Sequence, residues 1–180
     1  PGRIVAVLDE AGEQVPDGEV GEVAVRPGDP TQMIEYWGKP EATMARVRHG
    51  WIMTGDQAVR DAEGYIRYLG RDDDMVSSAG YRIGPAEVEE CLLRHPAVSE
   101  VGVISAPDEA RGEVVKAVIV LAKGFQPSDD LTKELQLQVK TQLAAYKYPR
   151  IVEFVEELPK TTTGKVNRKQ LAAQARASQA

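Results

Sequence analysis

The first seventy residues alternate short runs of apolar and polar positions with clusters of turn-forming residues. The alternating runs occupy residues 4–8, 19–26, 51–53 and 65–69. Clusters rich in Asp, Gly and Pro separate them at residues 9–12, 16–18 and 61–64. Alternation with a period of two is typical of strands with one buried face, and such clusters favour turns. The pattern predicts an antiparallel β region.

After residue 71 helical and strand patterns alternate. Strands are predicted at residues 101–104, 114–121 and 151–155. A helix is predicted at residues 85–94, because Pro85 suits an opening turn, acidic residues follow it, and Arg94 and His95 close it. Its buried stripe comprises Val88, Cys91 and Leu92. These elements indicate a small α/β domain.

A second helix is predicted at residues 129–143, where Leu131, Leu135 and Val139 recur four apart. Asp129 and Asp130 are its candidate caps. This assignment leaves Lys133 and Lys140 open to solvent or to a ligand.

Composition fits an ordinary globular protein of one medium or two small domains, with 180 residues, 42% hydrophobic and 28% charged. The single cysteine, Cys91, cannot form an internal disulfide, which indicates a reducing compartment, and cytoplasm is expected. No apolar stretch has the length of a membrane span or a signal peptide. Because a strand-like run follows Pro1 almost at once, we expect a fragment of a longer protein.

Charge is unevenly distributed along the chain. The net charge is −6, yet residues 140–180 carry eight Lys and Arg against three Asp and Glu. A local basic surface on an acidic protein favours a phosphate-bearing ligand over nucleic acid, which needs a broader positive field. Ordinary solvated charge is the alternative.

Residues 159–168 read Pro-Lys-Thr-Thr-Thr-Gly-Lys-Val-Asn-Arg. Gly164 permits a close backbone approach, the threonines supply hydroxyls, and Lys165 supplies a compact positive charge, a combination that suits a phosphate or carboxylate. The segment is not a nucleotide-binding P-loop, because Pro159 replaces the first glycine of that motif and Val166 replaces its Ser or Thr. A surface turn with a solvated lysine is the alternative.

Residues 70–84 lie between the two patterns and contain three adjacent aspartates, Asp72, Asp73 and Asp74. Their mutual repulsion favours a bend or a binding role, although they are poorly placed as metal ligands and a plain linker is the alternative. Gly80 and Gly84 bracket Arg82 immediately before a helix start, which suits an anion.

Asp56 follows Gly55 near the end of the strand-like run that begins at Trp51. An ionised carboxylate offers two oxygens, so Asp56 can accept two hydrogen bonds from a vicinal diol such as a ribose. A capping or turn aspartate is the alternative.

In this order, these segments resemble the C-terminal part of the adenylate-forming (ANL) superfamily, which joins acyl-CoA synthetases, luciferases and peptide-synthetase adenylation domains. The resemblance covers nearly the whole chain and rests on residues 54–56, 70–73, 80–83 with 87–89, and 159–165. Residues 78–89, 111–117 and 146–150 look most like medium-chain acyl-CoA synthetases. Ser77 and Tyr81 depart from the pattern of peptide-synthetase domains.

The resemblance implies an α/β (α+β) fold in which a small antiparallel β subdomain precedes a mobile α/β lid. Residues 1–70 would be the last β subdomain of an incomplete AMP-binding domain, residues 71–84 a hinge and CoA-contact loop, and residues 85–180 the lid. The partner would be the missing N-terminal domain of the same protein, with no membrane span and no nucleic acid. Because the phosphate loop and most of the acyl pocket would lie in that missing domain, the 180-residue piece is expected to make no acyl-CoA alone.

The implied reaction joins a carboxylic acid, ATP and CoA through an acyl-adenylate, on medium- or short-chain fatty acids. Lys165 would be catalytic, and Asp56, Arg71 and Lys165 would bind the nucleotide. Asp73 would be the hinge. The residues implied to contact CoA are Ala79, Gly80, Tyr81, Arg82, Arg111 and Lys140. No metal site is expected here, because the ligands of the implied Mg²⁺ lie outside this sequence.

Two other functions stay open. One is an adenylating enzyme that loads a carrier protein instead of CoA. The other is a non-catalytic lid module that binds CoA or a partner protein.

Overall fold

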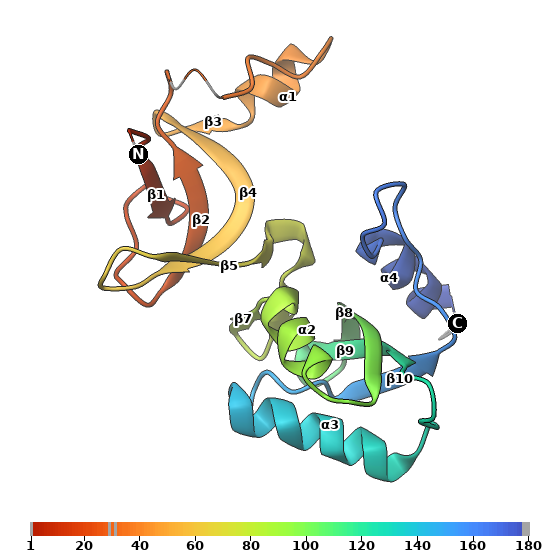
Figure 1. Cartoon of the computed structure of the whole chain (residues 1–180). Helices are drawn as coiled ribbons and strands as arrows, with labels where there is room; N and C mark the ends of the chain where they lie inside the picture. Colours follow the sequence, from red (N-terminus) through yellow and green to blue (C-terminus); the bar gives the residue numbers. More distant parts are fainter. Residues whose placement is uncertain (1, 29, 31, 178–180) are drawn as a thin grey trace. The chain divides into compact units, whose positions relative to one another are not determined.

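The computed structural model describes residues 2–28, 30 and 32–177 of the chain (Figure 1). The chain divides into two compact units, Pro1–Asp73 and Asp74–Ala180. Both combine sheet and helix, and the predicted mixed α+β class with an antiparallel first region is confirmed.

The first unit is built on a five-stranded antiparallel sheet. Its strands follow the order β1-β2-β4-β3, and β5 also pairs with β4. The elements are β1 (Val5–Leu8), β2 (Val20–Val25), α1 (Pro40–Met44), β3 (Val47–Arg48), β4 (Trp51–Arg60) and β5 (Ile66–Arg71). The register of β4 shifts against both β2 and β5, and β4 is strongly curved in Figure 1.

Alternating side chains of β1 bury on opposite faces of this sheet. Ala6 and Leu8 pack with Ala24 and Met53 on one face. Val7 packs with Val15 and Ala58 in a separate cluster. The predicted alternation is therefore that of strands with apolar residues on both faces.

The second unit is built on a sheet in which β9 (Gly112–Leu121) pairs antiparallel with β8 (Val98–Asp108) and parallel with β10 (Ile151–Val155). A short hairpin of β6 (Val76–Ser78) and β7 (Tyr81–Ile83) joins the start of β9 through Ser78 and Gly112. The helices of this unit are α2 (Pro85–Leu93), α3 (Asp129–Gln142) and α4 (Arg168–Ala177).

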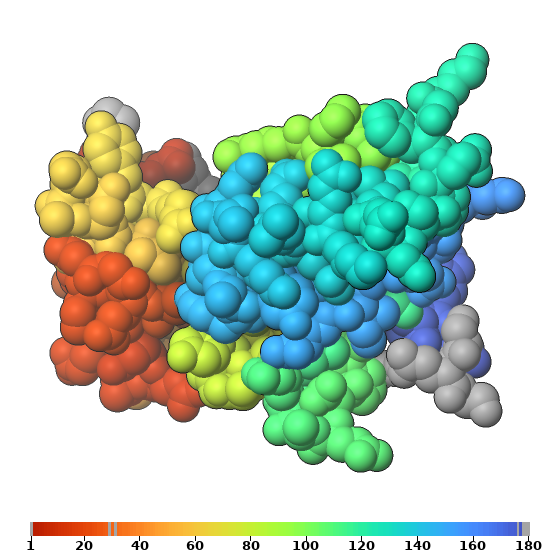
Figure 2. Space-filling model, turned by 90° about the horizontal axis from the view of Figure 1, so that it is seen from below, coloured from red at the N-terminus to blue at the C-terminus, as the bar shows by residue number. Residues whose placement is uncertain are grey.

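Each face of the β8–β9 pair carries its own cluster of buried side chains. Val101 and Val103 face α2 and α3 in the larger cluster. Ile104 lies on the other face with Leu158 and with Leu171 of α4. Helix α3 forms much of the face of this unit that is seen in Figure 2.

The predicted buried stripe of α2 is confirmed, since Val88, Cys91 and Leu92 are at most 2% exposed. Two of its acidic residues have specific partners. Glu87 accepts a hydrogen bond from the Lys147 ammonium at 2.7 Å, and Glu89 pairs with Arg168. Glu87 lies in the first turn, where its charge complements the positive end of α2, and both glutamates connect the helix to distant segments.

The predicted caps of α3 are wrong. The N-cap is Ser128, whose hydroxyl oxygen accepts a hydrogen bond from the Leu131 N–H at 3.1 Å. Asp129 and Asp130 occupy the first helical turn, where their charge complements the helix dipole. The buried stripe of Leu131, Leu135 and Val139 is confirmed.

Elements with weak apolar periodicity were not predicted. Strands β6 and β7 have three residues each, and α1 buries no side chain. Helix α4 is mostly polar and packs through Leu171 and small alanines.

No helix in residues 2–28, 30 and 32–177 is long and apolar enough to cross a bilayer.

Cys91 provides a direct test of this core. It lies on α2, and its sulfur is 3.6 Å from the Gln142 side-chain oxygen. Burial raises the pKa of the Cys91 thiol above its ordinary value. Because thiolate and access both control reactivity, we expect a thiol reagent at pH 7 to label the native chain at least about tenfold more slowly than the urea-unfolded chain. Ellman's reagent measures both rates, and equal rates would contradict the buried position.

Candidate functional site

Lys165 lies on an exposed turn between β10 and α4. The Thr161 N–H donates to the Lys165 carbonyl at 2.8 Å, and the Gly164 N–H donates to the Thr161 carbonyl at 2.9 Å. Gly164 has a φ of +82°, a conformation that favours glycine. Among the described residues, no hydrogen-bonding or ion-pair partner contacts the Lys165 ammonium. The turn therefore holds its backbone by internal hydrogen bonds and presents an unpaired cation.

Polar contacts fix the base of this turn. The Lys160 ammonium lies 2.8 Å from a Glu100 carboxylate oxygen on β8. The Asn167 N–H donates to the Pro159 carbonyl at 2.7 Å. The loop therefore has a defined position on the second unit.

Apolar side chains next to the same loop pack closely against Gly102 on β8. A Cβ at this position would lie 2.7 Å from Leu171 Cδ2 and 3.1 Å from Val166 Cγ1. Val166 is the next residue after Lys165. A side chain at position 102 would therefore push on α4 and on the lysine loop together.

We expect Gly102→Val to lower the free energy of unfolding by about 2 kcal/mol, because overpacking forces its neighbours to move. The matched control is Ser99→Val, an exposed position on the same strand, where a change within about 0.5 kcal/mol is expected. Urea denaturation of both variants measures the difference. Equal free energies of unfolding for the two variants would show that the lysine loop does not pack closely against β8.

Asp56 and Arg71 meet across β4 and β5 in the first unit. The two residues are register partners, and Arg71 Nη1 lies 3.0 Å from Asp56 Oδ1. The Asp56 side chain is 33% exposed, and no described residue forms a hydrogen bond or ion pair with its other carboxylate oxygen. The pair leaves hydrogen-bonding capacity on both side chains for a ligand.

Gly55 allows two guanidinium groups to approach the backbone beside Asp56. Its φ is +78°, and a Cβ there would lie 2.8 Å from Arg46 Nη1 and 3.0 Å from Arg71 Nη2. A cavity of about 150 Å³ opens beside these groups. Its lining residues are Glu22, Arg46, Arg48, Gly55, Arg71, Asp72 and Asp73.

Arg46 and Arg48 were not identified from the sequence. Arg48 pairs with Glu22, whereas the Arg46 guanidinium has no ion-pair partner among the described residues. Both arginines follow the short helix α1, whose pattern gave no signal. The Met53 N–H of β4 donates to the Arg46 carbonyl at 2.8 Å, and β3 pairs with β4 at Arg48, so both arginines line the cavity beside Gly55.

The three adjacent aspartates form a short 3-10 turn, Asp72–Asp74, at the boundary between the units. Asp72 accepts a hydrogen bond from Gln57, and Asp74 lies 3.6 Å from Arg168. The described residues include no group of three or more His, Cys, Asp or Glu side chains arranged to hold a metal ion.

The β6–β7 hairpin turns through Ala79 and Gly80. Both have positive φ angles, +49° and +84°, as the two central residues of a type I′ turn require. The Ala79 N–H donates to the Arg111 carbonyl at 3.1 Å, so the structure brings Ala79, Gly80 and Arg111 together. A Cβ on Gly80 would have nothing within 4 Å, so the tip of the hairpin is open.

Tyr81 and Arg82 follow this turn, and both are exposed. The Tyr81 ring stacks on Tyr146, with centroids 4.2 Å apart and an interplanar angle of 16°. Lys140 lies on a different element, α3, where its ammonium sits 4.0 Å from the centroid of Tyr148. Lys140 is therefore held over an aromatic ring, while Lys133 pairs with Asp130.

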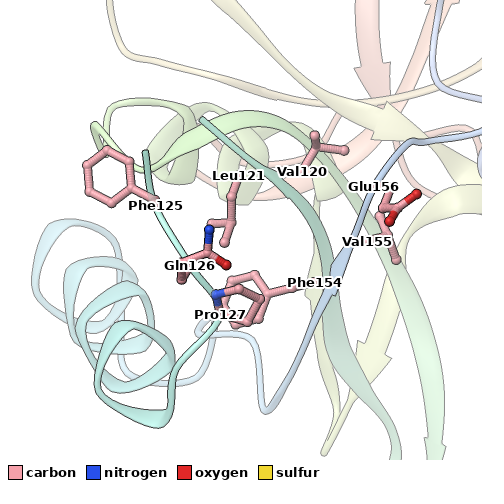
Figure 3. Close-up of a pocket in the computed structure, with 8 residues that line it drawn as sticks. All are labelled: Val120, Leu121, Phe125, Gln126, Pro127, Phe154, Val155 and Glu156. Atoms are coloured by element: carbon pink, nitrogen blue, oxygen red, sulfur yellow. The ribbon is translucent and has the colours of Figure 1, made fainter. Parts of the chain in front are cut away.

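Another hollow lies elsewhere in the second unit and has a volume of about 510 Å³. Figure 3 shows side chains from the ends of β9 and β10 and from the loop before α3 around it. Its lining residues are Val120, Leu121, Phe125, Gln126, Pro127, Phe154, Val155 and Glu156. No candidate residue from the sequence lines this hollow.

The second unit matches a known protein family. The AMP-binding enzyme C-terminal domain matches residues 87–165. The Rattus norvegicus protein named "Acyl-coenzyme A synthetase ACSM4, mitochondrial" is 51% identical over 175 residues, which are 94% of this chain and 30% of the rat protein.

Solved structures with the same fold include enzymes with different products. The anthranilate CoA ligase AuaEII, in complex with anthranoyl-AMP, matches with a TM-score of 0.87 and 40% identity, over 97% of this chain and 33% of the ligase. The amide bond synthetase McbA from Marinactinospora thermotolerans matches with a TM-score of 0.85 and 34% identity, over 97% of this chain and 35% of McbA. The chain thus spans about a third of the length of these relatives.

Proposed function

We propose that this chain is the C-terminal part of an AMP-forming acyl-CoA synthetase. The proposal starts from the finding that the chain belongs to the adenylate-forming superfamily and contains its AMP-binding enzyme C-terminal domain. In the first half-reaction a carboxylate oxygen attacks the α-phosphorus of ATP, which gives acyl-adenylate and releases pyrophosphate. In the second, the CoA thiol attacks the acyl carbon, which gives the thioester, AMP and a proton.

The observation that carries this proposal is the unpaired Lys165 ammonium on its internally bonded turn. Negative charge grows on the α-phosphate oxygens as the new P–O bond forms. A positioned cation stabilises that charge most effectively in a site closed to water, where no solvent must reorganise. Because no described residue neutralises Lys165, its charge is available to the reacting groups.

Asp56 and Arg71 are proposed to bind the nucleotide in the first unit. The free carboxylate oxygen of Asp56 accepts hydrogen bonds from the ribose hydroxyls. Arg71 holds Asp56 at 3.0 Å and has further N–H groups for ribose or phosphate oxygens. The ion pair therefore orients the carboxylate before the nucleotide arrives.

The β6–β7 hairpin and the Arg111 turn are proposed to receive CoA. The open tip at Ala79 and Gly80 leaves room for the pantetheine arm, and Tyr81 flanks it. Arg82, Arg111 and Lys140 supply positive charge for the CoA phosphates. Because the β6–β9 pairing links the hairpin to Arg111, both segments would contact CoA as one surface.

Asp73 is proposed as the pivot between the half-reactions. A turn of the backbone there would present Lys165 for adenylation and the hairpin for thioester formation. Each substrate would select the orientation that it binds more tightly. The domain division at residues 71–84, with a lid at residues 85–180, belongs to this proposal.

In the part of the chain that the structure describes, no group of three or more His, Cys, Asp or Glu side chains is arranged to hold the Mg²⁺ that accompanies ATP. Asp72 and Asp74 of the acidic triplet are engaged by Gln57 and Arg168, respectively. No catalytic step is therefore assigned to a metal held by these residues.

A reducing compartment such as the cytoplasm is proposed for this chain, because its single cysteine cannot form an internal disulfide.

Isotope exchange of pyrophosphate into ATP tests the first half-reaction. The assay uses the longest natural polypeptide that contains this chain, with a panel of short-chain, medium-chain and aromatic carboxylic acids. Exchange that depends on medium- or short-chain fatty acids would support the proposal. Absence of exchange with every acid would overturn it.

The second candidate is an adenylating enzyme with another acceptor. The likeness to McbA supports it, since the same fold serves an amide bond synthetase. Transfer of a labelled acyl group to CoA, to a phosphopantetheinyl carrier domain or to an amine would separate these acceptors. A chain that binds CoA but supports no exchange would instead be a non-catalytic lid module.

A further inference from the structure

The acidic triplet at residues 72–74 has a different environment at each position. Gln57 Nε2 donates to Asp72 Oδ1 at 3.0 Å, within the first unit. Arg168 Nη1 lies 3.6 Å from Asp74 Oδ2, within the second unit. Asp73 has no hydrogen-bonding or ion-pair partner among the described residues.

The donor to Asp72 is fixed by the first unit. The Gln57 side chain is 6% exposed and lies on β4 opposite Gly70 of β5. A buried amide has few alternative orientations, because it must satisfy its hydrogen bonds. Leu69 and Gly70 are buried, and the one residue between them and Asp72, Arg71, is paired with Asp56 of β4, so little chain before Asp72 is free to turn.

The partner of Asp74 is fixed by the second unit. Arg168 forms a two-point contact with Glu89 of α2, with Nη2 at 2.5 Å from Oε2 and Nε at 3.2 Å from Oε1. Glu89 Oε1 also accepts the Val103 N–H of β8 at 2.8 Å. The two residues after Asp74, Met75 and Val76, are already buried.

From this geometry we infer that Gln57 and Arg168 are positioning residues that anchor Asp72 and Asp74 and confine backbone rotation to Asp73. The inference rests on the proposed function, because it specifies how the proposed pivot is bounded. Arg168 lies three residues after Lys165 and opens α4. The same guanidinium therefore ties the lysine loop to the residue next to the pivot, so that the loop turns as a rigid part of the second unit.

Amide hydrogen exchange of the 180-residue chain tests these anchors without reference to catalysis. In Asp74→Asn we expect the amides of residues 74–76 to exchange about fivefold faster, the upper end for a partly exposed ion pair, while α3 is unaffected. In Gln57→Met we expect the same acceleration at residues 71–73, because Asp72 loses the hydrogen bond from the buried Gln57 amide.

The matched control is Asp130→Asn. Asp130 forms an ion pair of the same N···O distance, 3.6 Å, with Lys133, but on the exposed surface of α3. It should leave exchange at residues 71–76 unchanged. If Asp74→Asn and Gln57→Met also leave it unchanged, the anchors do not exist and the inference is overturned.

A second measurement separates this inference from the proposed function. In a polypeptide active in pyrophosphate exchange, Asp74→Asn should lower the rate of complete turnover about tenfold and leave the rate of adenylation within about twofold of the parent rate. The reason is that a looser pivot presents the β6–β7 hairpin for thioester formation less often. Faster exchange at residues 74–76 with undiminished turnover would support the anchors and count against the pivoting mechanism.

Discussion

Replacing Lys165 with alanine is expected to lower the rate of acyl-adenylate formation by about 10²–10³-fold. The loss is large because the ammonium group is proposed to meet charge that appears only as the α-phosphate is attacked. Thioester formation from chemically prepared acyl-adenylate should fall by no more than about threefold, because that step develops its charge elsewhere. Pyrophosphate exchange and single-turnover thioester formation measure the two rates separately.

The matched control for this variant is Lys123→Ala. Lys123 is also exposed, stands next to a glycine of positive φ, Gly124, and has no ion-pair partner among the described residues. It should retain both half-reactions. If Lys165→Ala slows both half-reactions equally, the lysine acts by general binding or stability, and the assignment to adenylation is wrong.

The second large effect is expected from Asp73→Pro. Proline fixes φ near −65° and restricts the residue before it, so a backbone that must adopt two orientations at this position is confined to one. We expect complete turnover to fall by about 10²-fold or more while at least one half-reaction persists. Comparing steady-state turnover with each isolated half-reaction measures this uncoupling.

Asp129→Pro is the control for the introduction of proline. Asp129 opens α3, a position where proline is tolerated because its N–H has no helical partner. The preceding residue, Ser128, is already extended, with φ −156° and ψ 159°, as a pre-proline residue prefers. Normal turnover in Asp129→Pro with normal turnover in Asp73→Pro would falsify the pivot.

The most accurate predictions from the sequence concerned regular elements with strong apolar periodicity. Strand β10 begins and ends at the predicted residues 151–155, and α2 and α3 end within one residue of their predictions. Strands β4 and β8 extend well beyond the predicted runs, because pairing with neighbours continues through positions whose side chains do not alternate clearly.

The candidate site was predictable as a set of residues but not as an arrangement. The predictions for the roles of Lys165, Asp56, Arg71 and the CoA-contact residues stay untested, and the structure adds the partners that surround them. Arg46 beside Gly55 and Gln57 beside Asp72 gave no signal of their own. Arg168 stood within the segment 159–168, but its partner Glu89 lies 79 residues earlier in the chain.

The sequence by itself determined the match of residues 87–165 to the AMP-binding enzyme C-terminal domain, the mixed fold class and the local character of each segment. These depend on residue order, side-chain period and the special backbone freedom of glycine. Only the tertiary structure decided which charges are neutralised and which remain available. Ion pairs such as Arg168 with Glu89 and Lys147 with Glu87 join residues far apart in the chain. Coulomb attraction depends on distance in space rather than separation in sequence. That Lys165 and Asp73 have no charged partner among the residues described could therefore be recognised only after folding had brought the other charges to their partners.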